Sequence, residues 1–349
     1  MINSPNSASV IWKIPTKNLL SQPHWQQVMK TAIRSVRVLA EQLNLPEDIV
    51  KKAEKATHLF PLFVPSPFLA RMEKGNLNDP LLRQVLPVID ETKLTVDFFT
   101  DPLGEKQANP VRGLLHKYKG RLLVFPGTTC GINCRFCFRR HFAYDENRAS
   151  RKQWQDIFSY IEEDKDIAEV ILSGGDPLAV NDQRLLWIVK QIAEIKHVSR
   201  LRIHSRLPIV IPSRINTTLL QWIKDIRLKV VMVVHCNHAN EIDAEVSQAL
   251  LQLKKAGVTL LNQSVLLKNI NDSVDALHDL SLSLFDNDVI PYYLHLPDKV
   301  QGTAHFDVDE QYARKLMGQL SRICSGYMVP RLVREVAGKG SKTILSPLY

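Results

Sequence analysis

The sequence has few of the residues that mark secreted, fibrous or membrane-spanning proteins. Five of its 349 residues are cysteine, an odd number too small for a domain held together by disulfide bonds. The 14 glycines and 19 prolines follow no period, which excludes a collagen-like or low-complexity chain. The longest run of aliphatic residues or methionine, Val230–Val234, is far shorter than the ~20 residues of a membrane helix. Residues 1–18 lack the apolar core of a signal peptide, so we expect a cytoplasmic protein with no membrane partner.

What remains is the composition of a folded, mildly basic protein. Hydrophobic residues make up 45% of the chain, which is enough for a packed core and excludes disorder. The 45 Lys and Arg residues exceed the 36 Asp and Glu residues, so the net charge is +9. This charge is compatible with an anionic ligand, but many folded proteins are mildly basic, and it does not predict nucleic-acid binding. The length predicts one large catalytic domain with an added segment.

The pattern of apolar residues changes along the chain. Residues 26–43 and 45–56 have helix-like spacing, and several prolines interrupt the chain after them. From about residue 120, short β-rich runs recur roughly 30 residues apart after a longer first interval, with helix-like stretches such as 181–195 and 243–257 between them. These runs are 121–127, 169–175, 200–206, 229–237, 259–267 and 288–296.

Six β-α units of this kind predict an α/β fold. Nearly continuous apolar strands that alternate with helices indicate a parallel sheet, and about 30 residues is the length of one β-α unit. Six units would form a partial (βα)6 barrel rather than the full eightfold one. Doubly wound packing is the alternative, although no glycine-rich dinucleotide turn follows the first strand. In such barrels the functional site lies where the strands end, and the strand ends here are polar.

Three cysteines stand together directly after the first predicted strand. Cys130, Cys134 and Cys137 form a C-x3-C-x2-C pattern, which can hold three irons of a [4Fe-4S] cluster and leave the fourth iron open to a small molecule. Zinc is the alternative, but the C-x2-C pair would need a second pair of ligands, and Cys236 and His238 lie three strands later. We favour the cluster.

The other cysteines have a simpler explanation. Cys236 and Cys324 are expected to be small buried residues of the core. The run HCNHANE at 235–241 could suggest a second metal site, but as the end of a strand it is expected to line the cavity for cofactor or substrate instead.

The cysteine motif resembles the signature of the radical S-adenosylmethionine enzymes. Phe136, the aromatic residue before the last cysteine, would then lie beside the adenine, and SGGDP at 173–177 resembles the second-strand motif that contacts the amino group of S-adenosylmethionine. The resemblance assigns five further positions to cofactor binding, namely Gly174, Gly175, Asp176, Ser205 and Gln263.

Motifs along nearly the whole chain resemble one family within this group, the lysine 2,3-aminomutases. The match is closest to the short members that serve β-lysylation of elongation factor P. The motifs are RMEKGNLNDPLLRQVLP (71–87), LLHKYKGR (114–121), CFRRHF (137–142), RIHSRLPIVIP (202–212), LLNQSVLL (260–267), PYYLHLPDKVQGTAHF (291–306) and GKGSKT (338–343).

The resemblance implies a fold and three segments. It predicts a partial (βα)6 TIM-like barrel of the radical S-adenosylmethionine type over residues 111–327. An N-terminal helical extension would precede it over residues 1–110, and a C-terminal segment, 328–349, would carry the lysine that binds pyridoxal 5′-phosphate.

That lysine would be Lys342, in GKGSKT. Lys339 is the nearby alternative, but the lysine of the family directly precedes a threonine, here Thr343. The resemblance also places Tyr118 and Arg121 in the cofactor pocket, together with Lys117, where the aminomutases often carry an arginine. A lysine keeps that charge but lacks the bidentate geometry of a guanidinium.

Substrate contacts are also implied. Arg139 would hold the substrate carboxylate, with Arg140 as the neighbouring alternative, since an arginine fork fixes the orientation of a carboxylate. Asp298 and Glu335 would face the side-chain ammonium of lysine. Glu335 stands where the lysine aminomutases have an aspartate, so the pocket there would be reshaped, and Glu335 could instead be a surface partner of a neighbouring arginine.

The implied activity is an isomerase reaction, the conversion of (S)-α-lysine to (R)-β-lysine. It would use a [4Fe-4S] cluster, S-adenosylmethionine and pyridoxal 5′-phosphate, and it would need an external one-electron reductant. The product would supply the ligase that modifies elongation factor P, and we expect no direct contact with nucleic acid. The chain ends seven residues after Lys342, without the C-terminal extension of the large aminomutases, which favours this role over a metabolic one. The alternatives are a radical enzyme with a different substrate and a non-enzymatic zinc or nucleic-acid module, the last suggested only by the basic charge.

Overall fold

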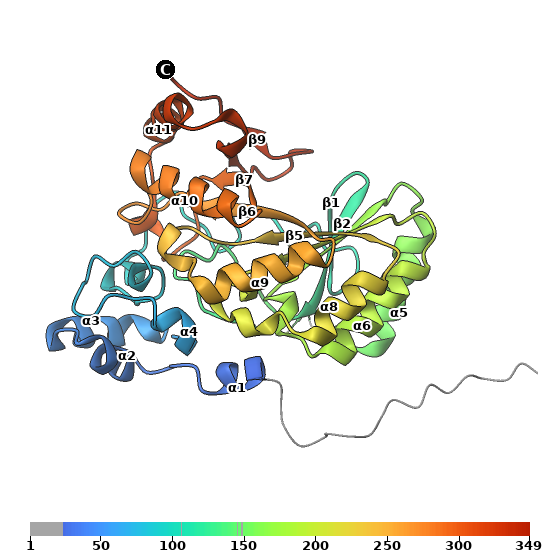
Figure 1. Cartoon of the computed structure of the whole chain (residues 1–349), viewed down its shortest axis with the longest axis horizontal. Coiled ribbons are helices and arrows are strands. Elements are labelled where there is room, and N and C mark those ends of the chain that lie inside the picture. The colour runs from blue at the N-terminus through green and yellow to red at the C-terminus, as the bar shows by residue number, and fades with distance from the viewer. Residues whose placement is uncertain (1–23, 106, 145, 148) are drawn as a thin grey trace, which may run out of the picture.

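The computed structural model describes residues 24–349 except 106, 145 and 148, and one sheet organises them (Figure 1). Its strands follow one another in chain order, so each strand pairs with the next one. The seven strands from β2 to β8 run parallel, whereas β1 and β9 are antiparallel to their neighbours at the two edges. The strands are β1 Leu114–Tyr118, β2 Arg121–Gly127, β3 Glu169–Gly174, β4 Arg200–Ser205, β5 Lys229–Val234, β6 Thr259–Val265, β7 Ile290–His295, β8 Arg331–Arg334 and β9 Thr343–Ile344.

A helix follows each of the six strands from β2 to β7, which confirms the predicted α/β fold of six β-α units. The helices are α5 Arg151–Glu163, α6 Asp182–Glu194, α8 Thr217–Asp225, α9 Ala244–Lys255, α10 Val274–Asp286 and α11 Glu310–Ile323. Figure 1 shows α5, α6, α8 and α9 side by side on the same face of the sheet. All six predicted β-rich runs coincide with β2–β7. Two short helices, α7 Leu207–Val210 and η4 Pro212–Arg214, lie between β4 and α8.

Local sequence explains why these helices form where they do. Each of the six begins after a serine, asparagine or aspartate whose side chain accepts a hydrogen bond from a backbone N–H of the first turn, as N-cap residues do. In α6 the inward residues Leu185, Ile188, Val189 and Ile192 recur at helical spacing and are fully buried. They belong to the main hydrophobic core between the sheet and its helices.

The described part of the N-terminal extension consists of short helices joined by irregular chain. These are α1 His24–Lys30, α2 Val36–Leu43, α3 Glu47–Thr57 and α4 Ser66–Leu69, whereas residues 1–23 of the predicted extension lie outside the described residues. The helical pattern over 26–43 forms two helices rather than one. The break occurs because Ile33 exchanges backbone hydrogen bonds with Val64, and Ser35 then caps α2.

A buried carboxylate ties this extension to the cysteine motif. Glu91, in the short helix η2 Ile89–Thr92, accepts a hydrogen bond from Arg135 Nε at 2.8 Å and one from Arg140 Nη2 at 2.7 Å. All three side chains are almost completely buried, so the two guanidinium groups depend on this carboxylate for their counter-charge. The extension therefore fixes both ends of the loop that contains Cys137.

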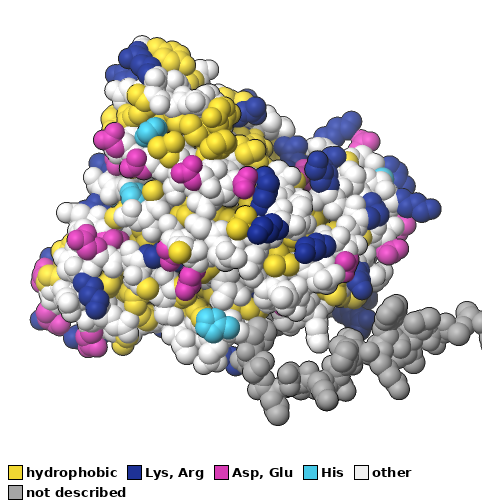
Figure 2. Space-filling view, viewed as in Figure 1, with side chains coloured by type: hydrophobic (Ala, Val, Ile, Leu, Met, Phe, Trp, Pro, Cys, Tyr) yellow, Lys and Arg dark blue, Asp and Glu magenta, His cyan; other side chains and the backbone are white. Residues whose placement is uncertain are grey.

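The C-terminal segment continues the same sheet. β8 pairs with β7, and β9 turns back along β8, so residues 331–344 form a hairpin at the edge of the barrel. On the face that Figure 2 shows, hydrophobic side chains gather over the C-terminal elements at the top of the view. Among the described residues, no helix is long and apolar enough to cross a membrane.

Candidate active site

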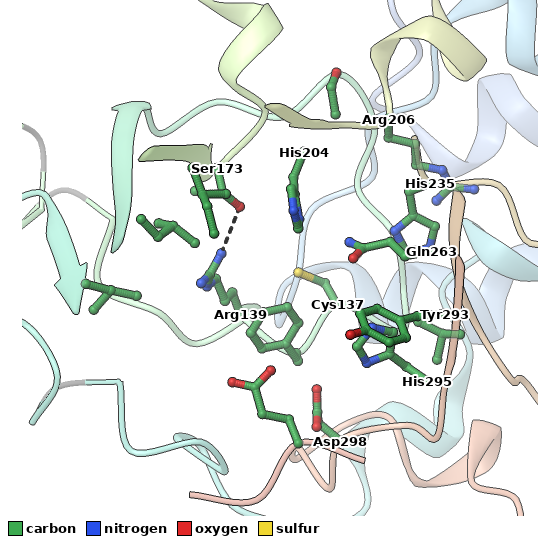
Figure 3. Close-up of a pocket in the computed structure, with 18 of the residues that line it drawn as sticks. Cys137, Arg139, Ser173, His204, Arg206, His235, Gln263, Tyr293, His295 and Asp298 are labelled. Atoms are coloured by element: carbon green, nitrogen blue, oxygen red, sulfur yellow. Dashed lines mark hydrogen bonds between the residues drawn. The ribbon is translucent and has the colours of Figure 1, made fainter. Parts of the chain in front are cut away.

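A single large cavity, with a volume of about 590 Å³, contains all sixteen residues that the sequence proposed for cofactor, substrate or metal binding. Its lining comes from the cysteine loop, the inner residues and ends of the parallel strands, and the C-terminal hairpin. Figure 3 shows the Cys137 sulfur between Arg139 on one side and Gln263 on the other, with Asp298 below them. The parallel sheet thus gathers side chains that lie more than 200 residues apart in the chain.

The three clustered cysteines lie on the loop after β2 and are surrounded by protein. Burial and the neighbouring Cys134 raise the pKa of Cys137 to about 11, and burial also raises the pKa of Cys130 and Cys134. These thiols therefore need a bound cation to become thiolates. In the described part of the chain, no three His, Cys, Asp or Glu side chains converge on one point that could hold a metal ion.

A buried arginine that the sequence did not single out contacts this loop. Arg206, directly after β4, donates a hydrogen bond from Nη1 to Cys134 Sγ at 2.6 Å. Its Nη2 donates to Gln84 Oε1 at 2.6 Å and to Glu241 Oε2 at 3.1 Å. Glu241 belongs to the HCNHANE run, and it also accepts the backbone N–H of Asn237, so this run supports the Arg206 network.

The two cysteines outside the motif are packing residues. Cys236 is completely buried and Cys324 is 7% exposed, as predicted. The side chain of Cys236 donates to the backbone carbonyl of His238, and its backbone N–H donates to Asn262 Oδ1.

The SGGDP motif packs directly against the chain that enters the cysteine loop. Gly174 has a φ of +113°, in the region that favours glycine, and a Cβ atom on Gly175 would lie 2.6 Å from the carbonyl oxygen of Thr129. Asp176 then accepts hydrogen bonds from Ser205 Oγ at 2.7 Å and from the backbone N–H of Arg206 at 2.8 Å. This carboxylate joins the ends of β3 and β4 beside the cysteines.

At the other end of the cavity, the C-terminal hairpin brings in Lys342. Its Nζ lies 2.6 Å from Glu335 Oε2, and the other oxygen of Glu335 lies 3.2 Å from Lys117 Nζ. Burial alone would raise the pKa of Glu335, but the two lysines outweigh it and lower the pKa to about 2. Lys339 is exposed and does not line the cavity. Arg334 pairs with Glu310 at 2.8 Å, so Glu335 is no partner of that arginine.

Arg139 points into the cavity, while Arg140 is held by Glu91 outside it. The Arg139 guanidinium forms a two-point ion pair with Glu105, with distances of 2.7 Å from Nε and 2.8 Å from Nη2. Lys117 Nζ lies 3.2 Å from the same carboxylate. Glu105 lies within the predicted extension in the segment DPLGEKQ (101–107), which carries no motif that would have identified it.

Five side chains therefore alternate in charge across the cavity, and we refer to them as the charge chain. In order they are Lys342, Glu335, Lys117, Glu105 and Arg139. Each of its members is less than a quarter exposed. A buried charge without a partner raises the free energy of the folded protein, so the pairs of the charge chain hold each of these groups in a defined position.

Apart from Asp176, whose carboxylate accepts hydrogen bonds from a hydroxyl and from backbone N–H groups, two further charged groups in the cavity have no ion-pair partner among the described residues. The Asp298 carboxyl makes no ion pair there, and burial together with the nearby Glu335 raises its pKa to about 7. Arg121 lies over the ring of Tyr118, 4.5 Å from its centroid, and no described carboxylate pairs with it. The cavity thus offers one acid to a cation and one guanidinium to an anion such as a phosphate.

Comparisons with known proteins agree with this site. A family model described as a 4Fe-4S single cluster domain matches residues 119–203, which include the three clustered cysteines and the SGGDP motif. The L-lysine 2,3-aminomutases of Haemophilus influenzae and Escherichia coli are each 47% identical to this chain, over 93% and 95% of its length and 96% and 97% of theirs. The chain belongs to the lysine 2,3-aminomutase family.

One less similar relative and one solved structure also match this chain. The L-lysine 2,3-aminomutase of Clostridium subterminale is 32% identical over 93% of this chain and 78% of its own length. A radical SAM methyltransferase from Sphaerobacter thermophilus overlaps 63% of this chain and 68% of its own, with 14% identity and a TM-score of 0.45.

This family member is an isomerase, and its parallel strands form a partial α/β barrel. The matching family model indicates a [4Fe-4S] cluster, and the sequence predicts S-adenosylmethionine and pyridoxal 5′-phosphate as the further cofactors. The residues of the cavity fit this set. Three buried thiols stand on one loop, the glycine motif of β3 lies beside them, and an unpaired guanidinium accompanies the one lysine of the C-terminal hairpin that reaches the cavity.

The close packing at Gly175 generates a prediction. A Gly175→Ala chain must displace the backbone at Thr129, so we expect a loss of stability of about 1–3 kcal/mol and reduced iron uptake. Denaturant unfolding of the apo chain and iron content after anaerobic reconstitution measure the two effects. Gly326→Ala is the matched control, because a Cβ there meets no atom within 4 Å. Equal iron content in the two variants would contradict this account of the glycine motif.

Proposed function

We propose that the chain catalyses the lysine 2,3-aminomutase reaction and forms (R)-β-lysine from (S)-α-lysine. The observation that carries this proposal is that one cavity joins the cysteine loop to Lys342 and to the unpaired Asp298 carboxyl. The names of the two relatives that are 47% identical support it, since both are L-lysine 2,3-aminomutases. Chemistry on lysine needs groups for a carboxylate, an α-amine and an ammonium, and the cavity contains candidates for all three.

In this proposal, residues on and near the cysteine loop bind two cofactors, the cluster and S-adenosylmethionine. Cys130, Cys134 and Cys137 bind three irons of the cluster. The residues that would hold S-adenosylmethionine line the cavity beside these cysteines, and they are Phe136, Gly174, Gly175, Asp176, Ser205 and Gln263. When bound, the cluster and S-adenosylmethionine supply a carbon radical that removes and returns a hydrogen atom, and pyridoxal phosphate carries the amino group that moves.

The residues at the other end hold pyridoxal phosphate and the substrate. Lys342 attaches the cofactor covalently, and the unpaired guanidinium of Arg121 binds its phosphate together with Lys117 and Tyr118. Arg139 binds the substrate carboxylate. Asp298 and Glu335 face the side-chain ammonium. The carboxylate end of lysine therefore meets a cation, and the ammonium end meets carboxylates.

Anaerobic turnover tests the proposal. The reconstituted enzyme with a chemical one-electron reductant and (S)-α-lysine should produce (R)-β-lysine, detected by chiral chromatography. Lys342→Ala should abolish the product, whereas Lys339→Ala should retain it, because Lys339 is exposed and lies outside the cavity. A wild-type enzyme that forms no β-lysine under these conditions would reject the reaction, and full activity of Lys342→Ala would reject the assignment of the lysine.

The raised pKa of Asp298 predicts how lysine binding depends on pH. Below a pH of about 7 this carboxyl is neutral, so it loses its attraction for an ammonium, and the affinity for lysine should fall as the pH decreases through this value. Calorimetry on the unreduced, cofactor-loaded enzyme at pH values on both sides of 7 measures the effect. Asp298→Asn should bind lysine weakly with little change over this range. Norleucine, which lacks the ammonium, is the control ligand, and a pH dependence that survives in Asp298→Asn would remove Asp298 from the site.

We further propose that the β-lysine supplies the ligase that modifies a lysine of elongation factor P, which places the reaction in the cytoplasm. The support is the sequence resemblance along nearly the whole chain to the family members with this role. In a deletion strain, intact-mass measurement should show elongation factor P without its β-lysyl group, and added β-lysine should restore it. If elongation factor P is unchanged while free β-lysine disappears, the enzyme is a metabolic aminomutase.

A further inference from the structure

We infer that Glu105 is a positioning residue for the substrate carboxylate, because it holds one edge of the Arg139 guanidinium and leaves the other edge open to the substrate. This inference rests on the proposed role of Arg139. Glu105 comes from the segment that precedes the barrel, so it would make part of the extension necessary for recognition of the substrate.

The hydrogen bonds of Arg139 show which edge is free. A guanidinium has five N–H groups, and the carboxylate of Glu105 accepts one from Nε at 2.7 Å and one from Nη2 at 2.8 Å. Of the three remaining N–H groups, one on Nη1 and one on Nη2 point along the edge between these two nitrogens. Among the described residues, the only further hydrogen-bond partner of the guanidinium is Ser173 Oγ, at a long distance of 3.4 Å from Nη1, and Figure 3 shows this contact at the wall of the cavity. A second carboxylate can therefore approach from the cavity without displacing Glu105.

The surroundings keep the guanidinium in this orientation. The Arg139 Cζ atom lies 4.8 Å from the ring centroid of Phe138 and 5.5 Å from that of Phe125, so aromatic rings restrict its plane. Rings alone do not determine the rotation of the guanidinium within that plane. The two-point contact with Glu105 does, because both oxygens must meet specific N–H groups.

Glu105 is itself held in place and stays ionised. It is 4% exposed, and its backbone N–H donates to Asp101 Oδ1 at 3.0 Å. Burial would raise the pKa of this carboxyl, but Arg139 and Lys117 outweigh burial and lower it. Because Lys117 Nζ lies 3.2 Å from Glu105, the group of Arg139, Lys117 and Glu105 carries a net charge of +1, which a substrate carboxylate neutralises. The substrate carboxylate thus meets two cations and one fixed carboxylate.

Comparison of lysine with lysinamide tests this role, since lysinamide lacks the carboxylate that Arg139 would bind. In the wild type, lysine should bind more tightly and have a higher kcat/KM than lysinamide. Glu105→Gln keeps the shape of the side chain but loses the charge that fixes the guanidinium. We expect it to weaken lysine binding about tenfold, with the loss mainly in KM, and to change lysinamide little. Glu105→Asp, which retains the charge, should recover part of the preference for lysine.

Two measurements and one control separate positioning from general damage. Dissociation constants come from calorimetry on the unreduced, cofactor-loaded enzyme, and kinetic constants come from anaerobic turnover. Asp182→Asn is the control variant, because it breaks a buried ion pair with Arg214, 2.6 Å long, outside the cavity. A loss of stability of that kind should affect lysine and lysinamide alike.

The outcomes decide between the possibilities. A loss confined to lysine in Glu105→Gln supports the inference. Equal losses for lysine and lysinamide in this variant, or a wild type that binds both ligands equally, overturn it. If the wild type forms no β-lysine, the proposed reaction fails, but the two dissociation constants still show whether Glu105 governs recognition of a carboxylate.

Discussion

The pairing of buried charges is the constraint on which the active site depends. The cavity concentrates lysines, arginines and carboxylates whose side chains are largely buried, and an unpaired buried charge costs several kcal/mol. The structure meets this cost by alternating the signs of the charges from Lys342 to Arg139. The alternation fixes the lysine proposed to carry the cofactor and the arginine proposed to hold the substrate relative to each other, although they lie about 200 residues apart in the sequence.

The same constraint operates around the cysteine loop. Glu91 neutralises Arg135 and Arg140 on one side of the loop, and Glu241 faces Arg206, which contacts Cys134, on the other. Both carboxylates are completely or almost completely buried, and both come from segments outside the loop. The loop is therefore held by charge as well as by hydrophobic packing, and a guanidinium contacts the sulfur of Cys134. A hydrogen bond to a ligating sulfur is one of the factors that set the reduction potential of an iron-sulfur cluster.

Asp298 and Arg121 are two charged side chains of the cavity that lack an ion-pair partner among the described residues. Asp298 and Arg121 break the pattern of paired charges, and they do so inside the cavity rather than at the surface. A folded protein retains a buried, unpaired acid only where the cost is balanced elsewhere, and such positions concentrate at functional sites. In our proposal, the side-chain ammonium of lysine supplies the counter-charge of Asp298, and the phosphate of pyridoxal phosphate supplies that of Arg121. Binding of lysine would then pair a carboxyl that the folded protein alone leaves unpaired.

The sequence by itself determined the strands, the helices and the cysteine motif, because these depend on local patterns. The alternation of apolar runs, the Ser, Asn and Asp caps and the spacing from Cys130 to Cys137 are all visible without a structure. The pattern at 26–43 misled only because a long-range pairing of Ile33 with Val64 interrupts it. Only the tertiary structure shows that Arg139 lines the cavity and Arg140 does not, and it alone revealed Glu105 and Arg206. The physical reason is that the role of a charged side chain depends on which opposite charge the fold brings within hydrogen-bonding distance, and no spacing in the sequence records that.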